Sequence, residues 1–209
     1  MWCSRVCSFD VGITHLAFVT LDMHRDNGKL WIEIVETMLI DISVFKHHRV
    51  CREECTLRHE KTIHDWMAHV FQEIDYLVQP CASVLIERQP LQGLQAVEQA
   101  IFGKYREKAI LVSPRSMHKY FKIDQLDYEQ RKVAVVQKID DRIAMGEWRM
   151  GDHQSWVHMA RRHDIADAIA IAVFWCDTNR PWQQDRNNIS CNSTFEQMLL
   201  GHNYVHIKR

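Results

Sequence analysis

The chain has 209 residues, 46% of them hydrophobic, so it can bury a sizeable core, and its length fits one domain with elaborations better than two. Its formal net charge of -1 provides no overall attraction to nucleic acid, so any such binding needs a local basic patch or a metal ion. No apolar run approaches the roughly 20 residues of a membrane helix, and Arg5 and Asp10 interrupt the stretch where a signal peptide would be apolar. We therefore expect an intracellular protein without a membrane span, and the seven scattered cysteines fit reduced thiols.

Strands and helices alternate in the predicted structure. Three apolar runs separated by turn signals, including Asn27-Gly28, predict an antiparallel meander. Apolar runs without alternation predict buried parallel strands, and apolar residues at helical spacing predict helices. In chain order we expect strands at 5–10, 15–22 and 30–42, a helix at 57–78, a strand at 83–87, a helix at 92–106, a strand at 109–112, and helices at 128–145 and 164–176.

The last third of the chain contains two segments without clear periodicity. Residues 147–162 carry tryptophans and arginines in an irregular pattern, and we predict that this segment is exposed. After Asp177 the chain becomes rich in Asn, Gln and Arg and loses its periodicity. We therefore predict one domain over residues 1–178 and a C-terminal tail over residues 179–209.

Four acidic residues follow or end apolar runs, or begin a predicted helix: Asp10, Glu87, Asp164 and Asp167. The ends of neighbouring parallel strands share one edge of a sheet, where Asp10 and Glu87 can converge. Asp164 and Asp167 are i and i+3 near a helix start, so both can reach one site. Gathered carboxylates repel one another unless divalent ions such as Mg²⁺ or Mn²⁺ lie among them. Two such ions about 4 Å apart support phosphodiester hydrolysis, which the pattern therefore predicts.

Simpler structural roles compete with this interpretation. Asp10 precedes Gly12 and could be a turn residue, and Asp164 and Asp167 could be ordinary acids of a helix N-terminus. Glu87 is harder to explain in this way, because its burial is costly unless Arg88 pairs with it.

Two other residue groups could bind ligands. Cys51, Cys55 and His59 would line one helical face, but three ligands along one helix do not enclose a zinc ion tetrahedrally, so a polar, His-rich connection is favoured. Aromatic residues near basic ones could stack on unpaired bases, although a place in the core is the favoured explanation for most of them. These are Trp148, Trp156 and Tyr105.

Four segments, in order over about residues 5–177, resemble the signature segments of RuvC-like Holliday junction resolvases. The resemblance is strongest to the branch found in poxviruses and other large DNA viruses, with relatives among fungal mitochondrial cruciform-cutting endonucleases. The segments are Phe9-Asp10-Val11-Gly12, Val84-Leu85-Ile86-Glu87-Arg88-Gln89-Pro90, Val112-Ser113-Pro114 and Arg161-Arg162-His163-Asp164-Ile165-Ala166-Asp167-Ala168.

The resemblance implies an RNase H-like α/β fold, with a mixed five-stranded sheet of three antiparallel and then parallel strands, flanked by helices. It implies a homodimeric DNA endonuclease that resolves four-way junctions and other branched DNA by paired symmetric nicks. It also implies a viral protein, acting at the host-cell site of viral DNA replication, in the cytoplasm or the nucleus.

The resemblance also assigns residues. The four acids Asp10, Glu87, Asp164 and Asp167 would bind two Mg²⁺ or Mn²⁺ ions per active site. Lys132, with Lys119 second, would be the basic residue near the scissile phosphate. The residues expected to contact DNA are Arg88, Arg115, Lys119, Arg131, Arg161 and Arg162.

One departure keeps alternatives open. His163 stands where viral relatives usually have a further Asp, and it could act as a base or as a metal ligand. One alternative is a non-catalytic junction-binding protein of the same fold. A second is an RNase H-type enzyme that cuts RNA in RNA–DNA hybrids. An ATP-binding protein that begins with a similar Asp10-Val11-Gly12 segment is the weakest, because the later nucleotide-binding glycines are missing.

Overall fold

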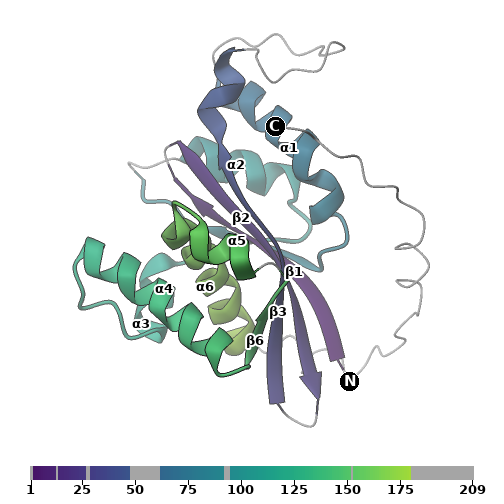
Figure 1. Ribbon diagram of the computed structural model, residues 1–209. Coiled ribbons are helices and arrows are strands. Elements are labelled where there is room, and N and C mark those ends of the chain that lie inside the picture. The colour runs from purple at the N-terminus through teal and green to yellow at the C-terminus, as the bar shows by residue number, and fades with distance from the viewer. Residues whose placement is uncertain are drawn as a thin grey trace. The chain divides into compact units, whose positions relative to one another are not determined.

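A six-stranded mixed sheet forms the centre of the protein (Figure 1). The computed structural model describes residues 2–12, 14–26, 29–47, 62–91, 95–151 and 153–179. The strands are β1 (Trp2–Val11), β2 (His15–Asp26), β3 (Lys29–Asp41), β4 (Ser83–Glu87), β5 (Ala109–Val112) and β6 (Trp148–Met150), and their order in the sheet is β5-β4-β1-β2-β3-β6.

The directions of the strands match the predicted arrangement. β1, β2 and β3 pair antiparallel, whereas β4 and β5 run parallel to β1. The predicted meander followed by parallel strands is therefore confirmed. The expected count of five strands was one too low, because β6 pairs in parallel with β3.

Helices cover both faces of this sheet (Figure 1). The helices are η1 (Ile42–His47), α1 (Ile63–Val78), α2 (Gln95–Lys104), α3 (Pro114–Tyr120), α4 (Tyr128–Ala144), α5 (His153–His158) and α6 (Arg162–Asn179). α1 and α2 pack together on one face, while α6 lies against β1, β2 and β4 on the other, with α3 and α4 packed on α6.

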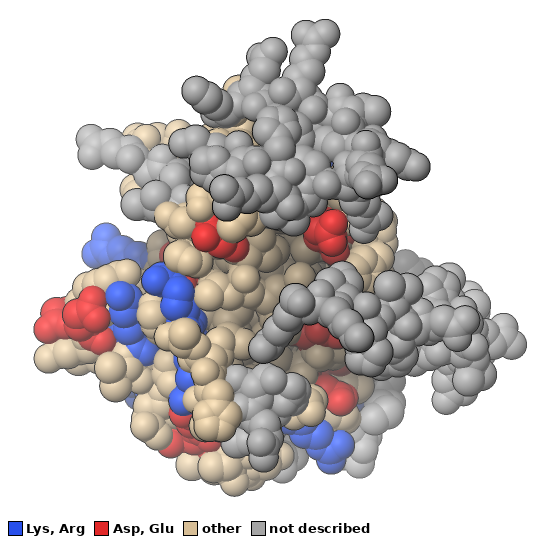
Figure 2. Space-filling model, turned by 45° about the horizontal axis from the view of Figure 1, so that its top comes forward, with Lys and Arg blue, Asp and Glu red and all other residues tan. Residues whose placement is uncertain are grey.

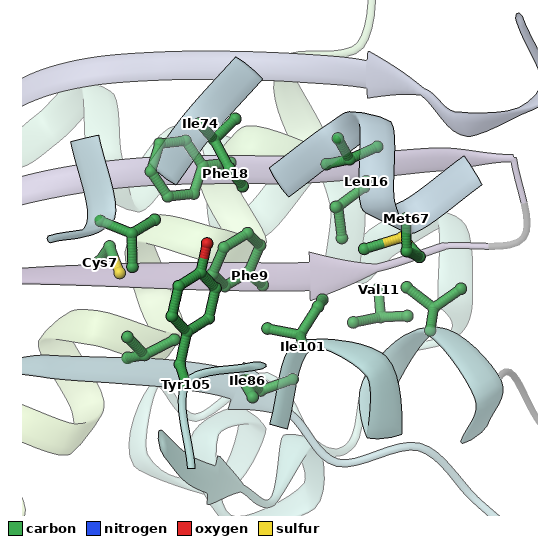
Figure 3. Close-up of a cluster of buried hydrophobic side chains, with 14 of the residues drawn as sticks. Cys7, Phe9, Val11, Leu16, Phe18, Met67, Ile74, Ile86, Ile101 and Tyr105 are labelled. Carbon is green, nitrogen blue, oxygen red and sulfur yellow. The ribbon is translucent and has the colours of Figure 1, made fainter. Parts of the chain in front are cut away.

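Alternation along β1 separates a hydrophobic core from the face that carries the acids. Phe9 points into a cluster shared with α1 and α2, where its ring centroid lies 4.9 Å from that of Phe18 (Figure 3). Its neighbours on the strand face α6 instead, and the Ser8 hydroxyl donates a hydrogen bond to the Ala168 carbonyl. Asp10 therefore follows Ser8 on the α6 face, two residues further along the strand.

The segment predicted to be irregular and exposed contains regular elements and buried tryptophans, so that prediction was wrong in part, although Arg149, Val157 and His158 are exposed. Residues 147–162 contain β6 and α5, and the Trp148 and Trp156 side chains are buried. The residues around Trp156 in the sequence are mostly polar, and they do not indicate its long-range partner. In the structure the Trp156 indole N–H donates to Asp140 at 2.8 Å. Helix α3 was also missed, although Ser113 caps it and Pro114 occupies its first turn.

Several predictions fall outside the described residues and stay predictions. These are the first part of the helix at 57–78, the start of the helix at 92–106, the tail at 179–209 beyond its first residue, and the zinc candidates Cys51, Cys55 and His59. Within the described part of the chain, no helix is long and apolar enough to cross a membrane.

Candidate active site

A pocket of about 640 Å³ contains all four predicted acids. It is lined by Asp10 of β1, Glu87 of β4, and Asp164 and Asp167 of α6, together with Lys132 of α4. Residues far apart in the sequence are thus brought to one place by the carboxyl ends of two parallel strands and the first turns of a helix.

The register of the sheet positions the first two acids. β1 and β4 are parallel, with Phe9 opposite Ile86, so Asp10 and Glu87 come next, side by side. Both strands alternate in the same phase, since Val84 and Ile86 join the core with α1 and α2 while Glu87 faces the pocket. The two carboxyl groups are close enough to share a hydrogen bond.

Gly12 allows the chain to turn directly behind Asp10. Its backbone N–H donates to the His15 carbonyl at 3.0 Å, closing the connection from β1 to β2. A Cβ atom on Gly12 would lie 2.5 Å from that same oxygen, closer than real contacts allow. The Asp-x-Gly pattern of the sequence therefore has a local physical cause, which is the close approach of two backbone segments.

The acids of α6 differ in their surroundings. Asp164 accepts a hydrogen bond from Arg161 Nε at 2.6 Å, forming an ion pair. His163 Nε2 lies 3.0 Å from the other Asp164 oxygen, but it is buried and makes no hydrogen bond to any described residue. Asp167, one turn further along the helix, lines the pocket close to the charges of Glu87 and Asp164.

Burial and mutual repulsion raise the proton affinity of three of these acids. Burial raises the pKa of Asp10 well above its ordinary value, and the charges of Glu87 and Asp167 add to the effect. Burial also raises the pKa of Glu87, although hydrogen bonds from its neighbours oppose this. For Asp167, burial and then the charges of Glu87 and Asp164 raise the pKa from 3.8 to about 7. The cluster therefore holds protons that isolated carboxyl groups would release.

The chemistry of this donor set suits a hard divalent cation, although the side chains are not yet gathered around one point. Among the described residues, no three His, Cys, Asp or Glu side chains are placed so that they would hold an ion as they stand. Carboxylate oxygens are the preferred ligands of Mg²⁺, and a cation would offset the repulsion that raises the pKa values. His163 Nε2 adds a buried nitrogen without a hydrogen-bond partner among the described residues.

Lys132 enters the pocket from α4. Its ammonium group lies 3.2 Å from Glu129 and 4.0 Å from the centre of the Tyr128 ring. Hydrogen bonding with Tyr128, and then with Glu129, raises the pKa of Lys132. At neutral pH this side chain is therefore a cation next to the acids and not a proton acceptor.

The six basic residues predicted to contact DNA lie in three kinds of environment. Arg131 and Arg161 line the acid pocket, and Arg115 lines a smaller neighbouring pocket together with Arg131. Arg88 and Lys119 are exposed but line neither pocket.

Arg162 has a structural environment. It bonds both oxygens of Asp140 at 2.6 Å and its guanidinium lies 4.6 Å from the centre of the Trp156 ring. Among the described residues on the face that Figure 2 shows, basic and acidic side chains lie in small interspersed groups and form no broad basic patch.

Sequence reasoning missed two residues that support Glu87. The Gln89 side-chain amide donates to Glu87 at 2.7 Å, and the Gln89 backbone N–H donates to Glu98 at 2.5 Å. Glu98 is only 3% exposed. Its signal in the sequence was an acidic residue between the core residues Val97 and Ile101 of an otherwise ordinary helix.

A third missed residue is Tyr128, for which the sequence pattern predicts only the start of a helix. It is 62% exposed and lines the acid pocket. The aromatic residues that lie near basic ones in the sequence are 7% (Trp148), 1% (Trp156) and 5% (Tyr105) exposed, which places them in the core, as favoured above over base stacking.

Comparisons with known proteins identify similar structures but no similar sequence. No protein-family model matches the chain, and no curated protein matches it. The fowlpox virus resolvase in complex with Holliday junction DNA is similar at a TM-score of 0.57 and 15% identity, covering 84% of this chain and 98% of that chain. A second structure of the fowlpox virus Holliday junction resolvase gives 0.56 and 16%, covering 83% and 99%.

RuvC of T. thermophilus in complex with a Holliday junction substrate has a TM-score of 0.46 and 16% identity, covering 83% of this chain and 96% of that chain. At such identities, the similarity to the viral structures shows the fold. The predicted RNase H-like fold is thereby confirmed.

Proposed function

We propose that this chain is a metal-dependent endonuclease that cuts branched DNA, including four-way junctions, by phosphodiester hydrolysis. One observation carries the proposal: four carboxylates from three separate elements converge in one pocket, and three of them have raised pKa values. Such repulsion is costly for a folded protein and is relieved by divalent cations, which suggests a role in binding them. The fold shared with the fowlpox virus resolvase supports the choice of DNA junctions as substrate.

In this proposal the four acids hold two Mg²⁺ or Mn²⁺ ions, with Asp10 and Glu87 contributing from the sheet and Asp164 and Asp167 from α6. When bound, such ions activate a water molecule and stabilise the charge that develops on the phosphate. Gln89 fixes the Glu87 carboxylate through its 2.7 Å hydrogen bond. Lys132, kept protonated, provides a positive charge for the scissile phosphate.

The Asp164–Arg161 ion pair gives Arg161 a defined part in this scheme. A carboxylate that takes up a cation weakens its hold on a neighbouring guanidinium, which is then available to a phosphate oxygen. His163, whose pKa is lowered by burial, is neutral at pH 7 and can serve as a further ligand or a proton acceptor. We propose that two copies act as a homodimer, because paired symmetric nicks require two sites related by a two-fold axis.

The proposal is tested by cleavage of a labelled synthetic four-way junction in Mg²⁺ or Mn²⁺, with linear duplex and RNA–DNA hybrid as control substrates. The wild type is compared with Asp164→Asn and with Glu107→Gln, which removes an exposed carboxylate outside the pocket. We expect symmetric nicks in the junction that require metal, disappear in Asp164→Asn and persist in Glu107→Gln.

Two other outcomes would redirect the assignment. Tight junction binding without cleavage in either metal would favour a non-catalytic protein, which the Arg161–Asp164 ion pair and His163 also fit. Cleavage confined to the hybrid, and dependent on the 2′-hydroxyl of the cut strand, would make the enzyme a ribonuclease.

A further inference from the structure

Tyr128 is a large aromatic side chain held in a solvent-exposed position at the acid pocket. It is the first residue of α4, it lines the pocket, and it is 62% exposed. Its backbone is fixed by a capping box, in which Asp127 accepts from the Gln130 N–H at 2.8 Å and the Gln130 side chain accepts from the Asp127 N–H at 3.2 Å. A ring presented to solvent from a rigid helix start needs little ordering when a ligand binds.

A cation accompanies this ring. The Lys132 ammonium lies 4.0 Å from the ring centre, one helical turn along α4. The pair thus offers an aromatic surface and a positive charge within one short stretch of helix, next to the four carboxylates. A nucleotide has the complementary features, because it carries a flat base and a charged phosphate in one small unit.

We propose that Tyr128 stacks on an unpaired nucleobase of the DNA strand that is cut, next to the scissile phosphate that Lys132 contacts. This inference rests on the proposed function, and it adds a base-binding subsite to the catalytic pocket. Opened bases occur where strands exchange in a branched substrate, so the subsite would favour branch points over uninterrupted duplex. Stacking tolerates any base, because every base has a π face, and it therefore contributes selectivity for structure more than for sequence.

The test is direct binding of a four-way junction with 2-aminopurine at the branch point, in Ca²⁺, a hard cation that can occupy the carboxylates in place of Mg²⁺, with a gel confirming that no strand is cut. Tyr128→Ala is compared with Tyr128→Phe and with Tyr76→Ala, a matched control on α1 that removes a 71% exposed tyrosine outside the pocket. We expect Tyr128→Ala to weaken the Kd roughly tenfold and to abolish the change in 2-aminopurine fluorescence on binding. Tyr128→Phe keeps the ring and should retain both, and Tyr76→Ala should behave as wild type.

Tyr128→Leu separates stacking from helix stability, because leucine keeps an apolar side chain and a good helix propensity but has no aromatic face. We expect it to lose the fluorescence change as Tyr128→Ala does, with an unchanged melting temperature. Unchanged Kd and fluorescence in both variants, in a protein whose wild type cleaves junctions, would overturn the subsite and leave the proposed function intact. A wild type that neither binds nor cleaves junctions would refute the proposed function, and the subsite with it.

Discussion

Replacement of Asp167 by Asn is expected to stabilise the metal-free protein above neutral pH. Burial, with the nearby charges of Glu87 and Asp164, raises the pKa of Asp167 from 3.8 to about 7. Because the folded state then holds this proton more tightly than the unfolded state, stability falls as pH rises from about 4 to about 7. Above that range the penalty of the ionised carboxylate is complete.

Its magnitude follows from the width of this range. About three pH units at about 1.4 kcal/mol each give a penalty of about 4 kcal/mol, which is an upper bound because the neighbouring acids titrate together with Asp167. An Asn side chain has nearly the same shape and no charge. The variant should therefore recover most of this penalty at pH 8 and less than half of it at pH 5, where the wild-type residue is largely protonated.

The assay is urea denaturation of the wild type, Asp167→Asn and the surface control Glu107→Gln in EDTA at pH 8 and pH 5. At pH 8, a gain approaching 4 kcal/mol corresponds to a melting temperature roughly 10 °C higher for a chain of this size. Glu107→Gln should show no pH-dependent difference from wild type. If Asp167→Asn is no more stable than wild type at pH 8, or gains equally at both pH values, the reasoning about a repulsive carboxylate cluster is wrong.

Two further variants probe the surroundings of the acids. Gly12→Ala places a methyl group 2.5 Å from the His15 carbonyl oxygen, which belongs to the backbone and cannot easily move away. We therefore expect the free energy of unfolding, measured by urea denaturation, to fall by about 1–3 kcal/mol. Wild-type stability would show that the turn can shift. Glu98→Ala removes the carboxylate that accepts from the Gln89 backbone N–H, so Gln89 should position Glu87 less well. We expect the Mg²⁺ concentration for half-maximal junction cleavage to rise several-fold. An unchanged metal requirement at an unchanged melting temperature would make Glu98 merely structural.

Two of the parallel strands, β4 and β5, were predicted with their observed bounds, and the reason is local, whereas β1 was predicted at 5–10 and extends over Trp2–Val11. Val84-Leu85-Ile86 and Ala109-Ile110-Leu111-Val112 are short continuous apolar runs, which a strand covered on both faces requires, and each is bounded by a turn or a proline. An acid at the end of such a run lies where the carboxyl ends of the parallel strands meet. The convergence of Asp10 and Glu87 therefore follows from sequence pattern and the rule that parallel strands share an edge.

The identity of the arginines that are available to DNA could not be predicted in the same way. Arg161 and Arg162 are adjacent in the sequence and both were expected to contact DNA. In the structure Arg161 bonds Asp164 at the pocket, whereas Arg162 bonds Asp140, 22 residues away on α4, and packs on the Trp156 ring. Nothing local in the sequence distinguishes the two side chains, because their partners are set by how α4, α5 and α6 pack.

The same pairing explains how a nearly neutral chain could still bind a polyanion. Two of the positive charges at the pocket are matched by acids close by: Arg161 by Asp164, and Lys132 by Glu129. In the proposed enzyme, divalent ions would take over the carboxylates of the pocket and thereby shift its local charge toward positive without any change in the residues. Affinity for phosphate would then depend on metal as well as on arginine and lysine, and a count of charged residues in the sequence would underestimate the attraction of such a site for DNA.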